Sequence, residues 1–145
     1  TGVQTCALPI LFDYSLLNEW HRALQATSIH CGSYADLDVP AGAFVYCDPP
    51  YRDSYADYGH AFTDEDHKDL IEWCRQLQER GCVVWLANRE ANDSFFEENA
   101  SDASVLRFDI TYTAGRKKKT ENGHEAVKAK DLLMIWNNKN MIKAA

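Results

Sequence analysis

Apolar residues recur at helical spacing in two stretches of the chain. Between about 14 and 26 they lie three or four positions apart, which predicts an amphipathic helix covering one face of a sheet, with Ser15 as its N-cap. A second helix is expected after the N-cap Thr63, with Asp66 as a capping-box acid, and it should end at Arg80 before Gly81. Its expected buried stripe is Leu70, Ile71, Cys74 and Leu77.

Between and after these helices, short apolar runs predict strands at 27–31, 44–47, 82–86, 104–111 and 131–137, with a short helix at 92–98. Helices that alternate with strands indicate an α/β, Rossmann-like sheet. The run 82–86 is apolar throughout, as in a parallel sheet that is covered on both faces. Asn88 follows this run, and it is expected to face the same crevice as Asp48 if the two strands are neighbours.

Residues 44–51 read FVYCDPPY and end a buried strand abruptly, because neither proline has an N–H to continue it. Asp48 and the Pro49 carbonyl then present two acceptors on a stiff backbone, beside the ring of Tyr51. An exocyclic amine on a flat base offers two N–H donors and a π-face, which complement these groups. The alternative is a Pro-Pro turn in which Asp48 is a cap.

The chain has 145 residues, enough for one domain, and its composition is that of a soluble globular protein. No apolar run approaches the ~20 residues of a membrane span, and no secretory signal is recognisable. The five cysteines are odd in number and form no C-x-x-C pair, which indicates reduced thiols in a cytoplasmic compartment. His67 is expected on the exposed side of its helix, where no partner at suitable spacing supports a metal site.

The net charge of −7 disfavours a nucleic-acid partner until its distribution is considered. Residues 115–130 hold six basic and two acidic residues, a net +4, which leaves nine basic and twenty acidic residues elsewhere, a net −11. A basic patch in the expected loop 113–130 indicates contact with DNA phosphates, and the alternative is a solvated loop. The residues expected to contact DNA are Arg116, Lys117, Lys118 and Lys119.

The segment Asp48-Pro49-Pro50-Tyr51 resembles the DPPY motif of S-adenosylmethionine-dependent DNA adenine N6-methyltransferases of the Dam type, the D12 class. Residues 31–36 resemble the segment that precedes this motif, and the later elements follow the family's order from about 11 to 137. Residues 138–145 are expected to be a tail. Residues 1–10 are expected to be a fragment end or a non-native remnant, and the alternative is a short native strand.

The resemblance implies S-adenosylmethionine as methyl donor, double-stranded DNA as partner, no metal and a monomer. Tyr34 is implied to contact the methyl donor together with Asp48, and its alternative is a tyrosine buried between strand and helix. Tyr55 and Tyr58 border the implied base pocket, where they either stack on bases or pack the loop down. The implied catalytic residues are Asp48, Pro49, Pro50 and Tyr51.

The resemblance also implies a seven-stranded sheet with a reversed strand near its end. The family's F-x-G-x-G turn is not found, so the N-terminal part of the fold is expected to be missing, and the chain alone is expected to expose sheet edges and be inactive. A cytosine-N4 or RNA amino-methyltransferase, or a dead DNA-binding relic of a phage or mobile element, remains open. Whether a restriction enzyme accompanies the methyltransferase also remains open.

Overall fold

The computed structural model describes residues 14–52, 61–91, 93–112, 118–120, 123–125 and 127–137. They belong to two units, Thr1–Leu37 and Asp38–Ala145. The expected terminal segments 1–10 and 138–145 therefore lie outside the described residues.

The first unit contains helix α1 (Tyr14–Gln25) and the single 3₁₀ turn η1 (Tyr34–Asp36). The predicted helix is confirmed, but Ser15 lies inside its first turn and is not the N-cap. Residues 27–31 form no strand, which corrects the expectation. A strand exists only through pairing with a neighbour, and no described strand pairs with this segment. Ser33 instead caps η1, because its hydroxyl accepts from the Ala35 amide at 3.2 Å.

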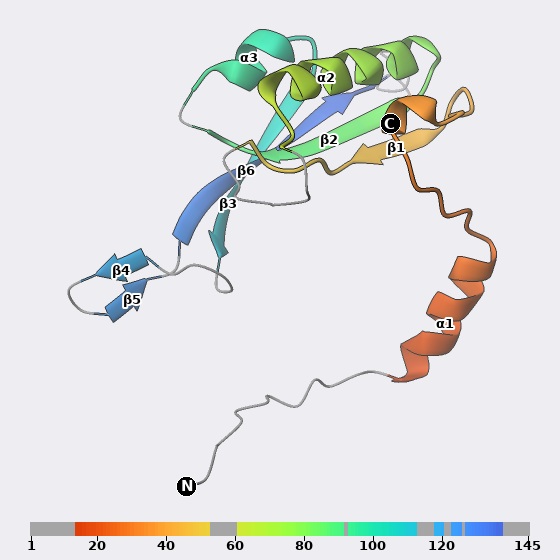
Figure 1. Cartoon of the computed structure of the whole chain (residues 1–145), viewed down its shortest axis with the longest axis horizontal. Helices are drawn as coiled ribbons and strands as arrows, with labels where there is room; N and C mark the ends of the chain where they lie inside the picture. The colour runs from red at the N-terminus through yellow and green to blue at the C-terminus, as the bar shows by residue number, and fades with distance from the viewer. Residues whose placement is uncertain are drawn as a thin grey trace, which may run out of the picture. The chain divides into compact units, whose positions relative to one another are not determined.

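The second unit is built on a four-stranded sheet of order β1-β2-β6-β3 (Figure 1). The strands are β1 (Phe44–Cys47), β2 (Val83–Arg89), β3 (Ser104–Tyr112) and β6 (Val127–Trp136). β1 and β2 are parallel, whereas β6 is antiparallel to both β2 and β3. A reversed strand late in the chain therefore lies inside the sheet, as the resemblance implied.

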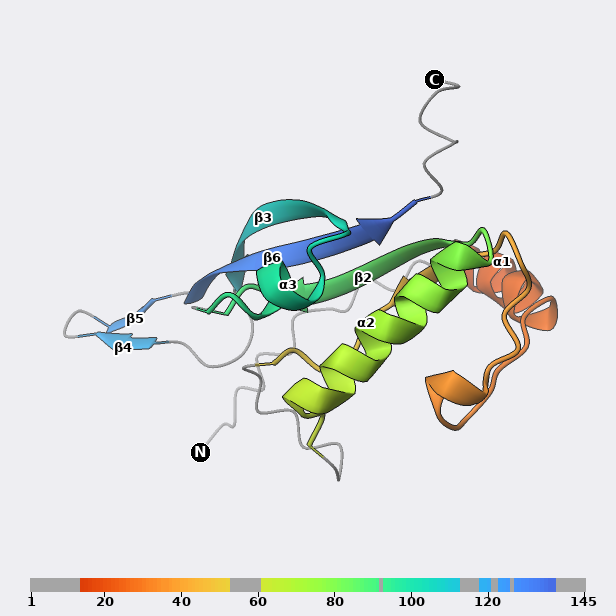
Figure 2. The same ribbon diagram turned by 90° about the horizontal axis from the view of Figure 1, so that it is seen from above.

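The segment 113–130 is not one loop. Strands β4 (Lys118–Thr120) and β5 (Gly123–Glu125) pair as an antiparallel hairpin, which extends beyond the N-terminal start of β6 in Figure 2. β6 begins at Val127, so Lys128 and Lys130 lie in a sheet strand. Charged residues disfavour strands locally, but their pairing with β3 prevails here.

Helix α2 (Asp64–Glu79) contacts β2 and β6 and lies on the same side of the sheet as α3 (Phe95–Asn99) (Figures 1 and 2). Its capping box is confirmed, since the Thr63 hydroxyl accepts from the Asp66 amide and Asp66 accepts from the Thr63 amide at 2.7 Å. The predicted stripe is buried. Gly81 follows the helix with a φ of 83°, which a residue with a Cβ rarely adopts. α3 starts three residues later than predicted.

The covered face of the sheet forms the core. Along β2, the side chains of Val84, Leu86 and Asn88 are buried, while the intervening ones are half-buried. The expectation of a sheet covered on both faces is thus wrong for the described residues. β1 is an edge strand, and Phe44 and Tyr46 are 60% and 55% exposed.

Replacing Thr63 by alanine removes the hydroxyl that accepts from the first turn of α2. We expect Thr63→Ala to lower the free energy of unfolding by about 1 kcal/mol in a urea titration. Thr63→Ser keeps the hydroxyl and should behave like the wild type. Equal losses in both variants would contradict the capping role.

The same box predicts an acid-dependent contribution to stability. Hydrogen bonds from the Thr63 hydroxyl and amide lower the pKa of Asp66. A carboxyl whose pKa is lower in the folded state stabilises the fold above its unfolded pKa of about 4 and loses this effect as the pH falls. Between pH 6 and pH 3, Asp66→Asn should therefore lose less stability than the wild type, with the exposed Asp109→Asn as the control.

Candidate active site

The acid and prolines of the 44–51 segment lie where β1 ends. Cys47 is the last residue of β1 and pairs with Leu86 of the parallel strand β2. Asp48, directly after β1, and Asn88, near the C-terminal end of β2, therefore lie at the same end of the two strands, as expected for neighbouring strands. Asp48 is exposed and Asn88 is fully buried, so the two side chains have different surroundings.

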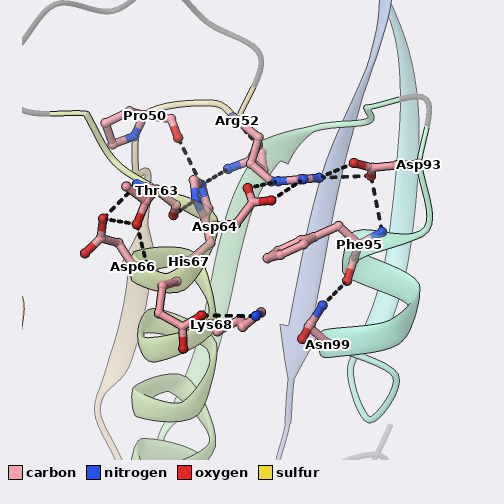
Figure 3. A network of polar contacts seen from close by, with 12 residues as sticks. Pro50, Arg52, Thr63, Asp64, Asp66, His67, Lys68, Asp93, Phe95 and Asn99 are labelled. Atoms are coloured by element: carbon pink, nitrogen blue, oxygen red, sulfur yellow. Dashed lines mark hydrogen bonds and ion pairs between the residues drawn. The ribbon is translucent and has the colours of Figure 1, made fainter.

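His67 is buried, with 1% of its surface exposed, so its prediction as a surface histidine is wrong. Its Nε2 atom lies 3.1 Å from the Pro50 carbonyl oxygen, and its Nδ1 atom lies 2.9 Å from the Thr63 carbonyl oxygen (Figure 3). Both carbonyls only accept, so a proton on Nε2 makes the ring a donor to Pro50 and one on Nδ1 makes it a donor to Thr63. The ring therefore joins α2 to the proline segment.

Asn88 holds the backbone on the other side of Tyr51. Its Oδ1 atom accepts from the amide of Arg52 at 3.3 Å and from the amide of Arg89 at 2.9 Å. Its Nδ2 atom lies 3.3 Å from His67 Nε2. Asn88 thus lies within β2, and its buried side chain accepts from the backbone after Tyr51. The sequence had predicted Asn88 at the tip of the strand.

Arg52 anchors the residues after the motif to two other elements (Figure 3). Its guanidinium donates to both carboxylate oxygens of Asp64 at 2.8 and 3.0 Å and to both of Asp93 at 2.9 and 2.8 Å. It also lies 3.9 Å from the centre of the Phe95 ring. The hydrogen bond with Asp64 raises the pKa of Arg52 and lowers that of Asp64. A planar, doubly paired guanidinium over a ring is a geometry that lysine cannot reproduce.

Tyr51 is half-buried between these anchors. The guanidinium carbon of Arg89 lies 5.4 Å from the centre of its ring, within the range of a cation–π contact. The Arg89 guanidinium on one side of the Tyr51 ring restricts the orientation of that ring. The segment thus carries an exposed carboxylate, Asp48, and a half-buried aromatic ring, Tyr51.

Cys47, directly before Asp48, shares a hydrogen bond with Cys74 of α2. This bond and burial raise the pKa of the Cys74 thiol, so Cys74 stays protonated at neutral pH. The thiol pair therefore packs the end of β1 against α2.

The other predicted site residues fall in separate places. Tyr34 is half-buried in η1 and lines an open hollow of about 490 Å³ with Cys31 and Asp36. Lys118 and Lys119 lie on β4. Tyr55, Tyr58, Arg116 and Lys117 lie outside the described residues.

Among the described residues, no three His, Cys, Asp or Glu side chains are grouped so as to hold a metal ion. None of the described helices has the length and apolar run needed to cross a membrane.

Sequence reasoning missed Arg52 and His67. His67 lies three and four residues before Leu70 and Ile71, so the helical period already placed it on the buried stripe. Because histidine is polar, this position was predicted to be exposed. Arg52 carries no local signal, because Asp64 and Asp93 are distant in the sequence.

The parallel pair β1–β2 beside the reversed strand β6 is consistent with a Rossmann-like methyltransferase domain. Residues 9–114 match the D12 class N6 adenine-specific DNA methyltransferases, and the chain belongs to this family.

Two curated relatives are type II methyltransferases. The chain is 34% identical over 95 residues to M.MjaIII of Methanocaldococcus jannaschii, across 60% of this chain and 33% of that protein. It is 29% identical over 119 residues to M1.LlaDCHI of Lactococcus lactis subsp. cremoris, across 75% of this chain and 41% of that protein. The matches thus span between a third and about two fifths of these relatives.

The contacts of Arg52 predict that even a conservative replacement destabilises the site. Arg52→Lys loses the paired hydrogen bonds and the stacking on Phe95, and we expect about 1–2 kcal/mol less stability in a urea titration. Arg107→Lys on β3, where the side chain is 42% exposed, is the matched control and should change stability much less. Equal effects in both variants would show that the Arg52 contacts contribute nothing special.

Proposed function

We propose that the chain holds the target amine in a DNA adenine N6-methyltransferase, which transfers a methyl group from S-adenosylmethionine to adenine N6 in double-stranded DNA. The observation that supports this most is the segment Asp48–Tyr51, which follows β1 and carries an exposed carboxylate and, three residues later, a half-buried ring. Membership of the family makes adenine in DNA the substrate to test first.

The proposed chemistry depends on two acceptors. The Asp48 carboxylate and the Pro49 carbonyl accept the two hydrogens of the amine and thereby orient its nitrogen lone pair. S-adenosylmethionine, when bound, supplies an electrophilic methyl group for that lone pair. Pro49 and Pro50 limit the movement of the acceptors because their rings fix φ.

Tyr51 is proposed to stack on the adenine. An amine inside a duplex cannot meet the methyl donor, so the base leaves the stack at a cost of a few kcal/mol. Stacking on an aromatic ring returns about 1–3 kcal/mol per base. The position of Arg89, 5.4 Å from the Tyr51 ring, supports a ring that is held in place before the base arrives.

Tyr34 and Asp48 are proposed to contact the methyl donor. An open hollow beside Tyr34 places this ring next to polar groups such as Asp36, and this supports the proposal for Tyr34.

The DNA backbone is proposed to contact the basic residues 116–119, and Tyr55 and Tyr58 to contact its bases. Lys118 and Lys119 follow each other on β4, one strand of a two-stranded hairpin, and they belong to the basic stretch 116–119 on which this proposal rests. Their register positions lie opposite Glu125 and His124.

Loss of the Asp48 carboxylate should abolish methyl transfer. The complete open reading frame that encodes this chain is expressed in a host without adenine methylation, and the host DNA is sequenced for N6-methyladenine. Asp48→Ala should lower transfer by about 10²–10³-fold or more while DNA affinity changes by less than about threefold. The surface variant Asp109→Ala is the control and should transfer at the wild-type rate.

Other outcomes favour other functions. N4-methylcytosine in the host DNA, or methylated RNA, would replace adenine by that substrate. Binding to DNA without any transfer would indicate a dead enzyme. Equal losses of DNA affinity and transfer in Asp48→Ala would make Asp48 a structural residue.

The basic hairpin should determine the salt dependence of DNA binding. Each lysine that contacts a phosphate contributes about one unit to the slope of log K against log salt, so Lys118→Ala/Lys119→Ala should reduce the slope by about two. Lys68→Ala, which removes a cation paired with Glu65 on α2, is the control. An unchanged slope in the double variant would remove the hairpin from the DNA interface.

A further inference from the structure

His67 and Asn88 are the two polar side chains in the buried core of the described residues, with 1% and 0% of their surfaces exposed. Burying a polar group costs free energy unless it is hydrogen-bonded, so such groups usually serve a defined partner. Both side chains direct hydrogen-bonding atoms at the backbone around Tyr51.

The two peptide groups that flank Tyr51 each contact one of these side chains. The Pro50 carbonyl oxygen, before Tyr51, lies 3.1 Å from His67 Nε2. The Arg52 amide, after Tyr51, donates to Asn88 Oδ1 at 3.3 Å. Pro49 and Pro50 have no N–H, so strand pairing cannot hold this stretch and side chains from other elements take its place.

The His67 ring is itself oriented by its surroundings. Its Nδ1 atom lies 2.9 Å from the Thr63 carbonyl, and the rings of Phe62, Phe95 and Phe96 surround it nearly edge-on, with centres 4.6, 6.2 and 6.2 Å away. A ring packed in this way has little freedom to turn. Its Nε2 edge is therefore held toward Pro50.

The Asn88 amide is oriented in the same manner. Two backbone amides, of Arg52 and Arg89, donate to its Oδ1 atom, which leaves Nδ2 facing His67 Nε2 at 3.3 Å. Nδ2 only donates, so with the proton on Nε2, where it donates to Pro50, the Nδ2–Nε2 approach is a packing contact and not a hydrogen bond. His67 on α2 and Asn88 on β2 thus both contact the backbone around Tyr51, directly after Asp48 and Pro49.

We infer that His67 and Asn88 are positioning residues for methyl transfer: as a clamp on the Pro50 carbonyl and the Arg52 amide, they set the place of Tyr51 and of the Pro49 carbonyl. Neither residue contacts the substrate in this role. The inference rests on the proposed function. A displacement of about 1 Å at a reacting centre can cost about 10²-fold in rate, which makes the clamp measurable in kcat.

Two variants of His67 separate the clamp from simple packing. Gln places an amide near the position of Nε2 and can still donate to Pro50, whereas Asn places its amide near Nδ1 and reaches only Thr63. In the complete enzyme, His67→Asn should lower kcat by about 10²-fold with the KM values for DNA and methyl donor within threefold. His67→Gln should retain kcat within about fivefold.

The clamp also has a readout that needs no activity. The Arg52 amide donates to Asn88, and Asn88 packs against His67. Hydrogen exchange of this amide in this chain should therefore be at least about tenfold faster in His67→Asn than in the wild type or in His67→Gln. Exchange of the Leu86 amide in β2 is the internal control and should remain the same in all three proteins.

Equal losses of kcat in both variants, or no loss in either, would overturn the positioning role. Unchanged exchange at Arg52 in His67→Asn would overturn the clamp itself. A wild-type enzyme that transfers no methyl group would overturn the proposed function, and exchange at Arg52 would then still decide separately whether His67 and Asn88 hold the segment around Tyr51.

Discussion

Two consecutive prolines leave the two positions after Asp48, just beyond β1, without N–H donors. Pro49 and Pro50 fix their own φ angles, but they cannot bond to a neighbouring strand. On either side of Tyr51 lie the Pro50 carbonyl and the Arg52 amide, and buried side chains on α2 and β2 contact both. The backbone on both sides of Tyr51 is therefore contacted by buried side chains of the core.

Arg52 extends this dependence to the first turn of α2 and to the residues before α3. Its guanidinium joins Asp64 and Asp93 and lies over Phe95, so three segments distant in the sequence meet at one side chain. The first turn of α2 thereby has two functions. Its capping box begins the helix, and the same turn supplies Asp64 to Arg52 and the Thr63 carbonyl to His67.

The sheet places this network through its strand order. Because β1 and β2 are parallel neighbours, the end of β1 lies near Asn88 of β2, and α2 packs on β2 and β6. Inserting β6 between β2 and β3 brings the C-terminal strand against β2. Family membership agrees with this arrangement, and the chemistry proposed for Asp48 depends on it.

The amino-acid sequence by itself determined the strand 44–47 and its break, the capping box of α2, the stripe of Leu70, Ile71, Cys74 and Leu77, and the resemblance to the methyltransferase motif. These depend on contacts within about four residues or on the order of short motifs. The tertiary structure alone decided that His67 faces the Pro50 carbonyl, that residues 27–31 form no strand and that β6 starts at Val127. Each depends on a distant partner, such as the Pro50 carbonyl 17 residues before His67, and local periodicity carries no information about such partners.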